Sequence, residues 1–217
     1  MVLGADLIVF DLDGTLIDSS GDIAWAANMT LKSMGYGQLG PGEIKECIGW
    51  GIRPLLEKMM PEEPARRIDE AREVFLKFYG EHLVVNTRPY PGVVDTIEHF
   101  SGRDKKMAIV TNKPIGLTRK ILDELRLASF FMEVLGGDSV EHKKPHPEPL
   151  LKVIKSAGVK VPRTVFVGDS SVDCEAGRGA GVEVIGAAYG FRGRRELEEA
   201  GCRHIIEEMA ELKTVVE

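Results

Sequence analysis

The chain has 217 residues, of which 43% are hydrophobic and 29% charged, a balance typical of a folded protein with one sizeable core, or with a core and a smaller insert. Its formal net charge of −6 argues against a nucleic-acid or membrane partner. Its cysteines, Cys47, Cys174 and Cys202, are too widely spaced for a metal or disulfide pattern, and we identify no leader or membrane-spanning run, so we expect a cytoplasmic protein.

The first predicted element is a strand at residues 7–10, which is directly followed by the sequence DLDGTL. An unbroken apolar run is typical of a strand that is buried on both faces. Because burying a charge is costly, two carboxylates at the end of such a strand indicate a bound cation or a chemical task. Alternate strand residues point to the same side, so we expect Asp11 and Asp13 to address one small site. Gly14 then allows a sharp turn, and Thr15 adds a hydroxyl.

The next segment, residues 18–85, is predicted to be helical throughout. Helix-starting residues precede apolar positions at helical spacing, and glycines and prolines separate the helices. The predicted helices lie at about residues 18–34, at 41–48, from residue 54 onward, and at about 68–82. A linker rich in helix breakers follows at residues 86–92. We therefore predict a helical insertion at residues 18–85 within a core formed by residues 1–17 and 86–217.

Beyond residue 92, predicted helices and apolar strands alternate along the chain. The strands are predicted at residues 107–111, 132–135, 164–167 and 182–187, with a weaker one at 204–206. The helices are predicted near residues 93–101, 115–126, 147–157 and 172–180, with a further helix at the C-terminus. Such alternation indicates an α/β fold, in which helices cover both faces of a doubly wound, Rossmann-like parallel sheet.

Polar side chains follow several of these strands, and ligands of open parallel sheets bind beyond the carboxyl ends of the strands. Thr111 and Asn112 end a strand just before Pro114, a residue suited to the first turn of a helix. A hydroxyl and free N–H groups at a helix start can cradle a phosphate, although an ordinary helix cap has the same pattern. Lys144 precedes a proline and a predicted helix, where it can offer a positive charge to a phosphate. A solvated basic loop is the alternative for Lys144.

The strand at 164–167 repeats the pattern of the first strand, because it too ends in carboxylates. Asp169 and Asp173 are spaced to straddle the first turn of the following helix, and Ser170 lies between them. Together with the first two carboxylates they form a set of oxygen ligands, which suits Mg²⁺. Zinc would require histidine or cysteine ligands, and His142 and His146 lack partners at a suitable spacing.

These residues resemble the haloacid dehalogenase-like hydrolase superfamily, over the whole chain and in the right order. Its first motif matches residues 11–15, its second Thr111, its third Lys144, and its fourth residues 168–170 with Asp173. The helical insertion resembles the cap that one subfamily carries between the first and second motifs. The chain is most similar to the phosphoglycolate phosphatase branch, through IGWG at 48–51, PYPG at 89–92, KPHP at 144–147 and the GDS form of the fourth motif.

The resemblance implies a phosphatase that acts on a small phosphate ester through an aspartyl-phosphate. Asp11 would attack phosphorus, and Asp13 would protonate the leaving oxygen and later take a proton from water. Mg²⁺ would be held by Asp11, Asp169 and the backbone carbonyl of Asp13. Thr111 and Lys144 would bind the transferring oxygens, with Lys143 as the alternative lysine. Asp173 and Ser170 would support this set, Asp173 through Lys144 or through the water shell of the metal.

Specificity is expected to depend on the helical insertion, which would close over the site. The expected substrate-binding residues are Thr15, Asn112, Gly49, Trp50 and Arg53. The planar guanidinium of Arg53 would match a substrate carboxylate, such as that of phosphoglycolate, unless it is simply an exposed residue at a helix start. Dehalogenases of this superfamily lack an Asp at the position of Asp13, so we do not expect hydrolysis of carbon–halogen bonds.

Three other functions remain open from the sequence. The first is a phosphatase for a sugar phosphate, a nucleotide or pyrophosphate. The second is a transferase similar to phosphoglucomutase, which would return the phosphoryl group to a sugar. The third is a signalling domain that accepts a phosphoryl group, and such a domain also gathers acidic residues, a Thr and a Lys on a parallel sheet. The GTL sequence after Asp13 and the helical insertion argue against this third possibility.

Overall fold

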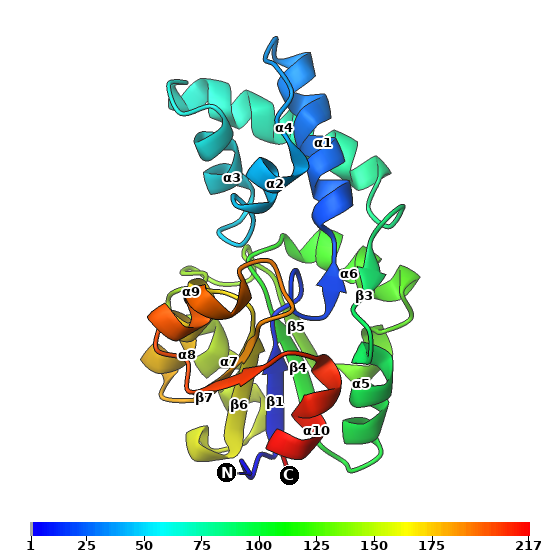
Figure 1. Ribbon diagram of the computed structural model, residues 1–217, viewed down its shortest axis with the longest axis vertical. Helices are drawn as coiled ribbons and strands as arrows, with labels where there is room; N and C mark the ends of the chain where they lie inside the picture. The colour runs from blue at the N-terminus through cyan, green and yellow to red at the C-terminus, as the bar shows by residue number, and fades with distance from the viewer. Residues whose placement is uncertain (1) are drawn as a thin grey trace.

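The computed structural model describes residues 2–217 and contains a six-stranded parallel sheet with the strand order β5-β4-β1-β6-β7-β8 (Figure 1). Strand β1 lies in its middle, between β4 and β6, with Phe10 opposite both Ile109 and Val167. The chain builds one half of the sheet from β1, β4 and β5 and the other from β6, β7 and β8, so the strand order reverses beside β1. Ligands of doubly wound sheets bind at such a point. The strands are β1 (Leu7–Phe10), β4 (Lys106–Val110), β5 (Glu133–Leu135), β6 (Thr164–Gly168), β7 (Glu183–Ala187) and β8 (His204–Ile206).

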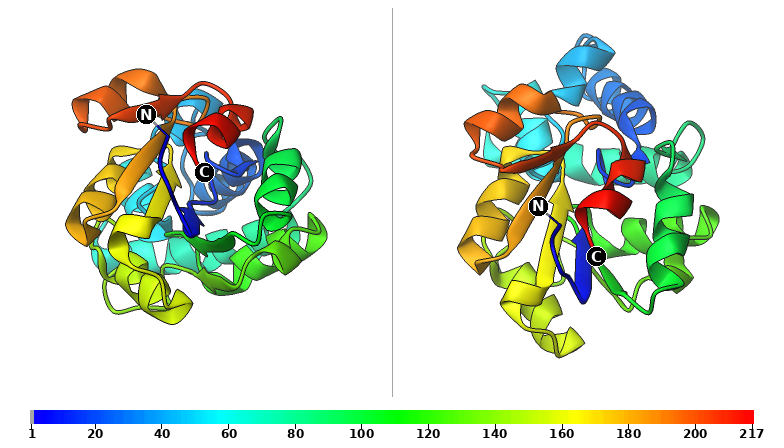
Figure 2. Two further views of the ribbon diagram at one scale, coloured as in Figure 1. Left: turned by 90° about the horizontal axis from the view of Figure 1, so that it is seen from below. Right: turned by 60° about the horizontal axis from the view of Figure 1, so that its bottom comes forward.

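Helices cover both faces of this sheet (Figure 2). The two-residue period of β1 explains why both faces need cover, since Leu7 and Val9 belong to one hydrophobic cluster and Ile8 and Phe10 to another. The first cluster includes residues of α7 and α8, and the second includes residues of α5, α6 and α10. The predicted α/β class is therefore confirmed. The helices are α5 (Val93–Ser101), α6 (Ile115–Glu124), α7 (Glu148–Ala157), α8 (Ser171–Ala180), α9 (Gly193–Glu199) and α10 (Leu212–Val215).

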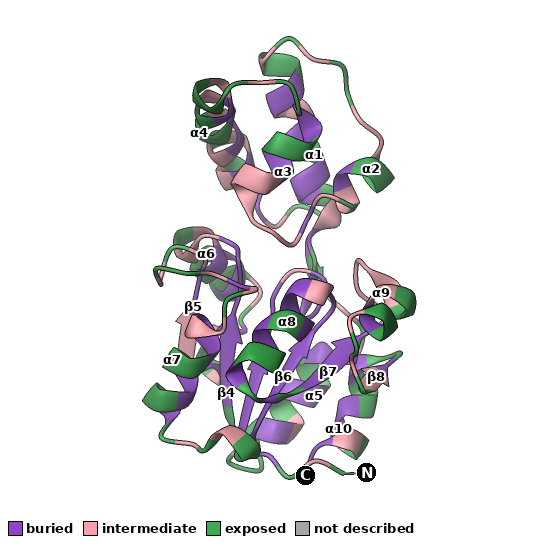
Figure 3. Cartoon of the chain, turned by 90° about the vertical axis from the view of Figure 1, so that its left-hand side faces the viewer, coloured by how far each residue is buried: buried purple, intermediate pink, exposed green. Residues whose placement is uncertain are grey.

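Four helices of the helical insertion lie beyond the carboxyl ends of the strands (Figure 1). They are α1 (Ser20–Ser33), α2 (Pro41–Lys45), α3 (Ile52–Met59) and α4 (Ala65–Glu81). Figure 3 shows that they bury the sides facing one another and expose the others, as amphipathic helices do. The division into a core and an inserted domain remains a prediction. Within residues 2–217, none of the helices has the combined length and apolar character that crossing a bilayer requires.

The two chain segments that enter and leave the insertion run side by side. Strands β2 (Ile17–Asp18) and β3 (Arg88–Pro89) pair in antiparallel fashion, a short ladder that the sequence pattern does not predict. Asp22 in α1 is fully buried and accepts five hydrogen bonds from four donors, the backbone N–H and side-chain groups of Asn86 and Thr87, at 2.8–3.0 Å. Although burial acts in the opposite direction, these bonds lower the pKa of Asp22, so the carboxylate stays charged and ties α1 to the returning segment.

Candidate active site

Four charged side chains meet where β1 and β6 end. The ammonium of Lys144 lies 2.9 Å from Oδ1 of Asp11 and 2.6 Å from Oδ1 of Asp173, and its side chain is only 1% exposed. Carboxylate oxygens of Asp11, Asp169 and Asp173 all lie within 4.8 Å of one another. The structure therefore brings together residues that are far apart in the sequence, as the convergence of strand ends predicts.

The loop geometry around Asp173 explains how Lys144 is held. Asp173 stands in the first turn of α8, where its Oδ2 accepts hydrogen bonds from the backbone N–H of Ser170 at 3.2 Å and from the Ser170 hydroxyl at 2.7 Å. These two hydrogen bonds fix the carboxylate of Asp173 and leave its Oδ1 available to Lys144. Burial alone would lower the pKa of Lys144, but the charges of Asp11 and Asp173 outweigh it and hold that pKa above its ordinary value. Lys144 is thus a fixed positive charge beside Asp11.

The three carboxylates carry more negative charge than this single lysine balances. Burial, opposed by Lys144 and reinforced by Asp173, raises the pKa of Asp11 to about 7. Burial and then the charges of Asp173 and Asp11 raise the pKa of Asp169 well above its ordinary value. A cluster of oxygen donors with surplus negative charge fits a hard divalent cation such as Mg²⁺, which Asp11 and Asp169 would hold.

Gly14 permits the close approach that this cluster requires. Its φ is +87°, and a Cβ at this position would collide with the Asp169 carboxylate. Gly190 is equally close to Asp169, and the backbone N–H of the next residue, Phe191, donates to Oδ2 of Asp169 at 2.8 Å. Asp169 is therefore packed against two glycines, which leaves its carboxylate little freedom of position.

Asp13 points to a different set of partners from Asp11. Its Oδ1 accepts a hydrogen bond from the Ser19 hydroxyl at 2.5 Å, and its Oδ2 lies 3.0 Å from the ammonium of Lys113. Lys113 in turn donates to the hydroxyl of Tyr79 at 2.7 Å. Burial would lower the pKa of Lys113, but Asp13 and Tyr79 hold it above its ordinary value, and burial raises the pKa of Tyr79 to about 12. Lys113 and Tyr79 were not among the residues expected at the site.

Two buried oxygen atoms near these groups lack a hydrogen-bond partner among the described residues, namely the Thr15 hydroxyl and Oδ1 of Asn112. The amide nitrogen of Asn112 donates to the backbone carbonyls of Gly49 and Lys144, at 3.0 Å each. Thr111 is 4% exposed, and its hydroxyl accepts the backbone N–H of Lys113 at 3.3 Å. Asn112 thus connects the end of β4 both to the loop that contains Lys144 and to Gly49 in the helical insertion.

One pocket joins these groups to the helical insertion. It is bounded by polar side chains from the strand ends and by apolar side chains from α1, α3 and α4, so one side of the pocket is apolar and the other is charged. Asp11 and Asp13 both line it, as expected for carboxylates that address one site. Its lining consists of Asp11, Asp13, Ile23, Ile48, Gly49, Gly51, Ile52, Leu55, Phe75, Tyr79, Thr111, Asn112, Lys113 and Pro114.

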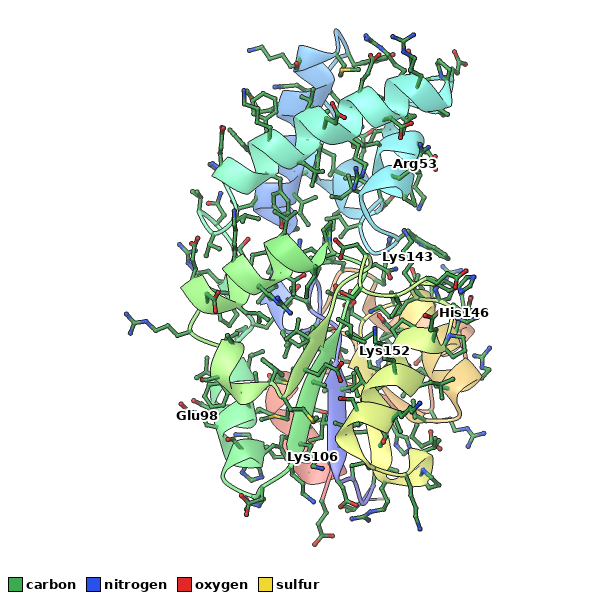
Figure 4. The ribbon with its side chains drawn as sticks, turned by 180° about the vertical axis from the view of Figure 1, so that it is seen from behind. Arg53, Glu98, Lys106, Lys143, His146 and Lys152 are labelled. Atoms are coloured by element: carbon green, nitrogen blue, oxygen red, sulfur yellow. The ribbon has the colours of Figure 1, made fainter. Side chains whose placement is uncertain are left out.

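The loop between α2 and α3 is held down on the core by its backbone carbonyls. Lys143 donates to the carbonyl of Trp50 at 2.7 Å, and Arg192 donates to those of Glu46, at 2.8 Å, and Ile48. Lys143 lies at the boundary between the insertion and the sheet (Figure 4). The ammonium of Lys143 is therefore engaged by Trp50, while that of Lys144 reaches Asp11.

The other residues that were expected to bind the substrate do not all line the pocket. Gly49 lines the pocket, whereas Thr15, Trp50 and Arg53 are not among the described residues that line it. The guanidinium of Arg53 pairs with Glu57 at 3.0 Å and with Asp69 at 2.5 Å, and its side chain is 41% exposed. Figure 4 shows Arg53 among the helices of the insertion. The structure therefore does not bring Arg53 to Asp11 and Asp13, because its position on α3 directs it toward α4.

Comparisons with known proteins agree with this geometry. Residues 8–187 match the family described as haloacid dehalogenase-like hydrolase. The chain is 42% identical over 185 residues to a phosphoglycolate phosphatase of Aquifex aeolicus, covering 85% of each chain. It is 33% identical over 215 residues to a phosphoglycolate phosphatase of Nitrosospira multiformis, covering 97% of this chain and 95% of the relative.

A solved structure has the same architecture. The crystal structure of a predicted phosphoglycolate phosphatase from Haemophilus somnus superposes with a TM-score of 0.93 at 30% identity and covers 99% of both chains. The resemblance that the sequence motifs indicate is therefore confirmed, including the branch of relatives to which it points. The chain belongs to the haloacid dehalogenase-like hydrolase family.

Proposed function

We propose that this hydrolase cleaves a small phosphate monoester, most favourably phosphoglycolate, by transferring the phosphoryl group first to Asp11 and then to water. The observation that carries this proposal is the buried Asp11 carboxylate, which contacts the fixed Lys144 ammonium at 2.9 Å and shares a pocket with a second carboxylate, Asp13. A nucleophile, a positive charge for the phosphate and an acid/base group are the parts that phosphoryl transfer through an enzyme carboxylate requires. The relatives named phosphoglycolate phosphatase support the choice of substrate.

Each residue has a defined task in this reaction. An oxygen of Asp11 forms a bond to phosphorus while the bond between phosphorus and the ester oxygen breaks. Asp13 gives a proton to that leaving oxygen and later takes one from the water that displaces Asp11. Lys144 and the Thr111 hydroxyl bind the phosphoryl oxygens. A bound Mg²⁺ would supply further positive charge between Asp11, Asp169 and the phosphate.

A panel of phosphate esters tests the proposed function. We expect the purified protein to hydrolyse phosphoglycolate with a higher kcat/KM than glucose 6-phosphate, a nucleoside monophosphate, pyrophosphate and an aryl phosphate. All of these activities should depend on Mg²⁺ and stop when a chelator is added. Release of inorganic phosphate provides the measurement. Equal or higher efficiency with a sugar phosphate would exclude phosphoglycolate as the preferred substrate, and no hydrolysis of any ester would exclude the phosphatase.

Metal binding can be tested without turnover. We expect Mg²⁺ to raise the thermal unfolding midpoint of the protein, because it relieves the repulsion among three buried carboxylates. A cation present at a hundred times its Kd stabilises a folded protein by about 2.7 kcal/mol. Asp169→Asn should lose most of this shift, whereas Asp138→Asn, which alters the carboxylate after β5, should keep it. Differential scanning calorimetry at constant ionic strength measures the shift, and an undiminished shift in Asp169→Asn would show that the cation binds elsewhere.

A further inference from the structure

Lys113 is a buried cation that lines the pocket together with apolar side chains of the helical insertion. Its side chain is 4% exposed and reaches from the loop after β4 toward Tyr79 on α4, a residue that is 1% exposed. The pocket beside it is lined by apolar side chains of the helical insertion, including Ile23, Leu55 and Phe75. Burying an ammonium is costly, so its presence among such side chains needs a reason beyond packing.

The hydrogen-bonding capacity of this pair is only partly used. An ammonium has three N–H donors, and those of Lys113 have two partners among the described residues, Asp13 and Tyr79. The Tyr79 hydroxyl accepts from Lys113, and among the described residues its own proton has no acceptor. One N–H of Lys113 and the O–H of Tyr79 are therefore left for a ligand. Two adjacent donors, one of them charged, match the two oxygens of a carboxylate.

The position of Lys113 also limits the length of such a ligand. Lys113 touches Asp13, the group that gives a proton to the leaving oxygen in the proposed reaction. A carboxylate bound by Lys113 can therefore be separated from the leaving oxygen only by a very short carbon chain. Among the described residues that line the pocket, Lys113 is the one whose side chain is cationic. The low polarity around it strengthens its attraction for an anion and weakens the binding of neutral groups that leave its charge unmatched.

We propose that Lys113 and Tyr79 form the anchor for the carboxylate of the substrate, which makes the enzyme selective for phosphate esters of short hydroxy acids. This inference rests on the proposed phosphatase function and assigns the role expected of Arg53 to a residue of the core. The anchor connects the two parts of the molecule, since Lys113 follows β4 and Tyr79 belongs to α4. A carboxylated substrate thus contacts the core and the helical insertion together, which favours the closed pocket in which the reaction proceeds.

The test compares two substrates that differ only in this group. Phosphoglycolate carries a carboxylate where 2-hydroxyethyl phosphate carries a neutral alcohol, and the ratio of their kcat/KM values reports recognition of that group within one variant. We expect Lys113→Met to lower this ratio about 100-fold and Tyr79→Phe to lower it about 10-fold, as expected for losing a charged and a neutral donor. Lys120→Met on the exposed side of α6 should leave the ratio unchanged. Tyr79→Phe keeps the ring and its packing, so it tests the anchor even if Lys113→Met folds poorly.

Each outcome has a separate meaning. If Lys113→Met and Tyr79→Phe lower kcat/KM equally for both substrates, Lys113 only positions Asp13 and the anchor is wrong. The anchor alone is also wrong if the wild-type protein hydrolyses both esters with the same efficiency. A wild-type protein that hydrolyses no phosphate ester contradicts the proposed function itself, before any variant is measured.

Discussion

Asp11→Asn is expected to lower kcat by at least about 10⁴-fold, because an amide cannot serve as the nucleophile that accepts the phosphoryl group. The substitution keeps the shape of the side chain and its carbonyl oxygen. This oxygen can still accept a hydrogen bond from the backbone N–H of Leu12, which lies 2.7 Å from Oδ1 of Asp11 in the wild-type protein. It also removes one of three mutually repelling buried carboxylates. We therefore expect the variant to stay folded, and steady-state kinetics with phosphoglycolate measures the loss.

Two controls separate loss of the nucleophile from loss of structure. Circular dichroism and thermal unfolding should show the same fold in Asp11→Asn as in the wild-type protein. Asp138→Asn, which alters another carboxylate that follows a strand of the same sheet, should retain activity. Substantial turnover by folded Asp11→Asn would mean that another group attacks phosphorus.

Asp13→Asn is expected to lower kcat for phosphoglycolate by about 10²–10⁴-fold, the usual contribution of a general acid/base. With an aryl phosphate the effect should divide between the two steps. The phenolate leaves without help from an acid, so Asp11 can still be phosphorylated, but the water that releases the phosphate has lost its base. A rapid burst of phenol followed by slow turnover is the expected result in a stopped-flow absorbance experiment.

The size of this burst should match the concentration of active sites. Ser19→Ala serves as the matched control, since it removes a hydroxyl that contacts Asp13 at 2.5 Å and leaves the carboxylate in place. It should give no comparable burst, because its base is still present. Linear release of phenol at the wild-type rate in Asp13→Asn would show that Asp13 takes no proton from water.

The sheet could be predicted from the sequence because its strands are buried runs whose ends carry polar residues. The strand predicted at residues 107–111 is β4 at Lys106–Val110, and that predicted at 204–206 is β8 with the same bounds. The pairing of β2 with β3 was not predicted, because it joins residues about seventy positions apart through only two residues on each strand. Such a contact depends on where the helical insertion begins and ends in space, which local patterns do not contain.

The charged part of the site was predictable for a related reason. Topology brings parallel strand ends to one edge, so Asp11 and Asp169 converge. Lys144 lies in the loop between β5 and α7 and contacts Asp11 and Asp173 from there. No comparable rule predicts which side chains of the helical insertion reach the pocket. Arg53 was expected in the pocket but pairs with Asp69, whereas Lys113, directly after Thr111 and Asn112, is buried and contacts Tyr79 of α4. The position of Lys113 beside the second motif was a signal in the sequence, but its partner Tyr79 depends on how α4 packs.

The most direct test of the account is to find where the phosphoryl group is bound during turnover. Asp13→Asn is mixed with an aryl phosphate and Mg²⁺, quenched in acid within the burst, digested and analysed by mass spectrometry. The peptide that contains Asp11 also holds Asp6, Asp18 and Asp22, so fragmentation of that peptide locates the phosphoryl group on one aspartate. We predict that one phosphoryl group is found on Asp11 and that hydroxylamine removes it, as for an acyl phosphate. A phosphoryl group on another residue, or continued turnover with no phosphorylated enzyme, would contradict the account.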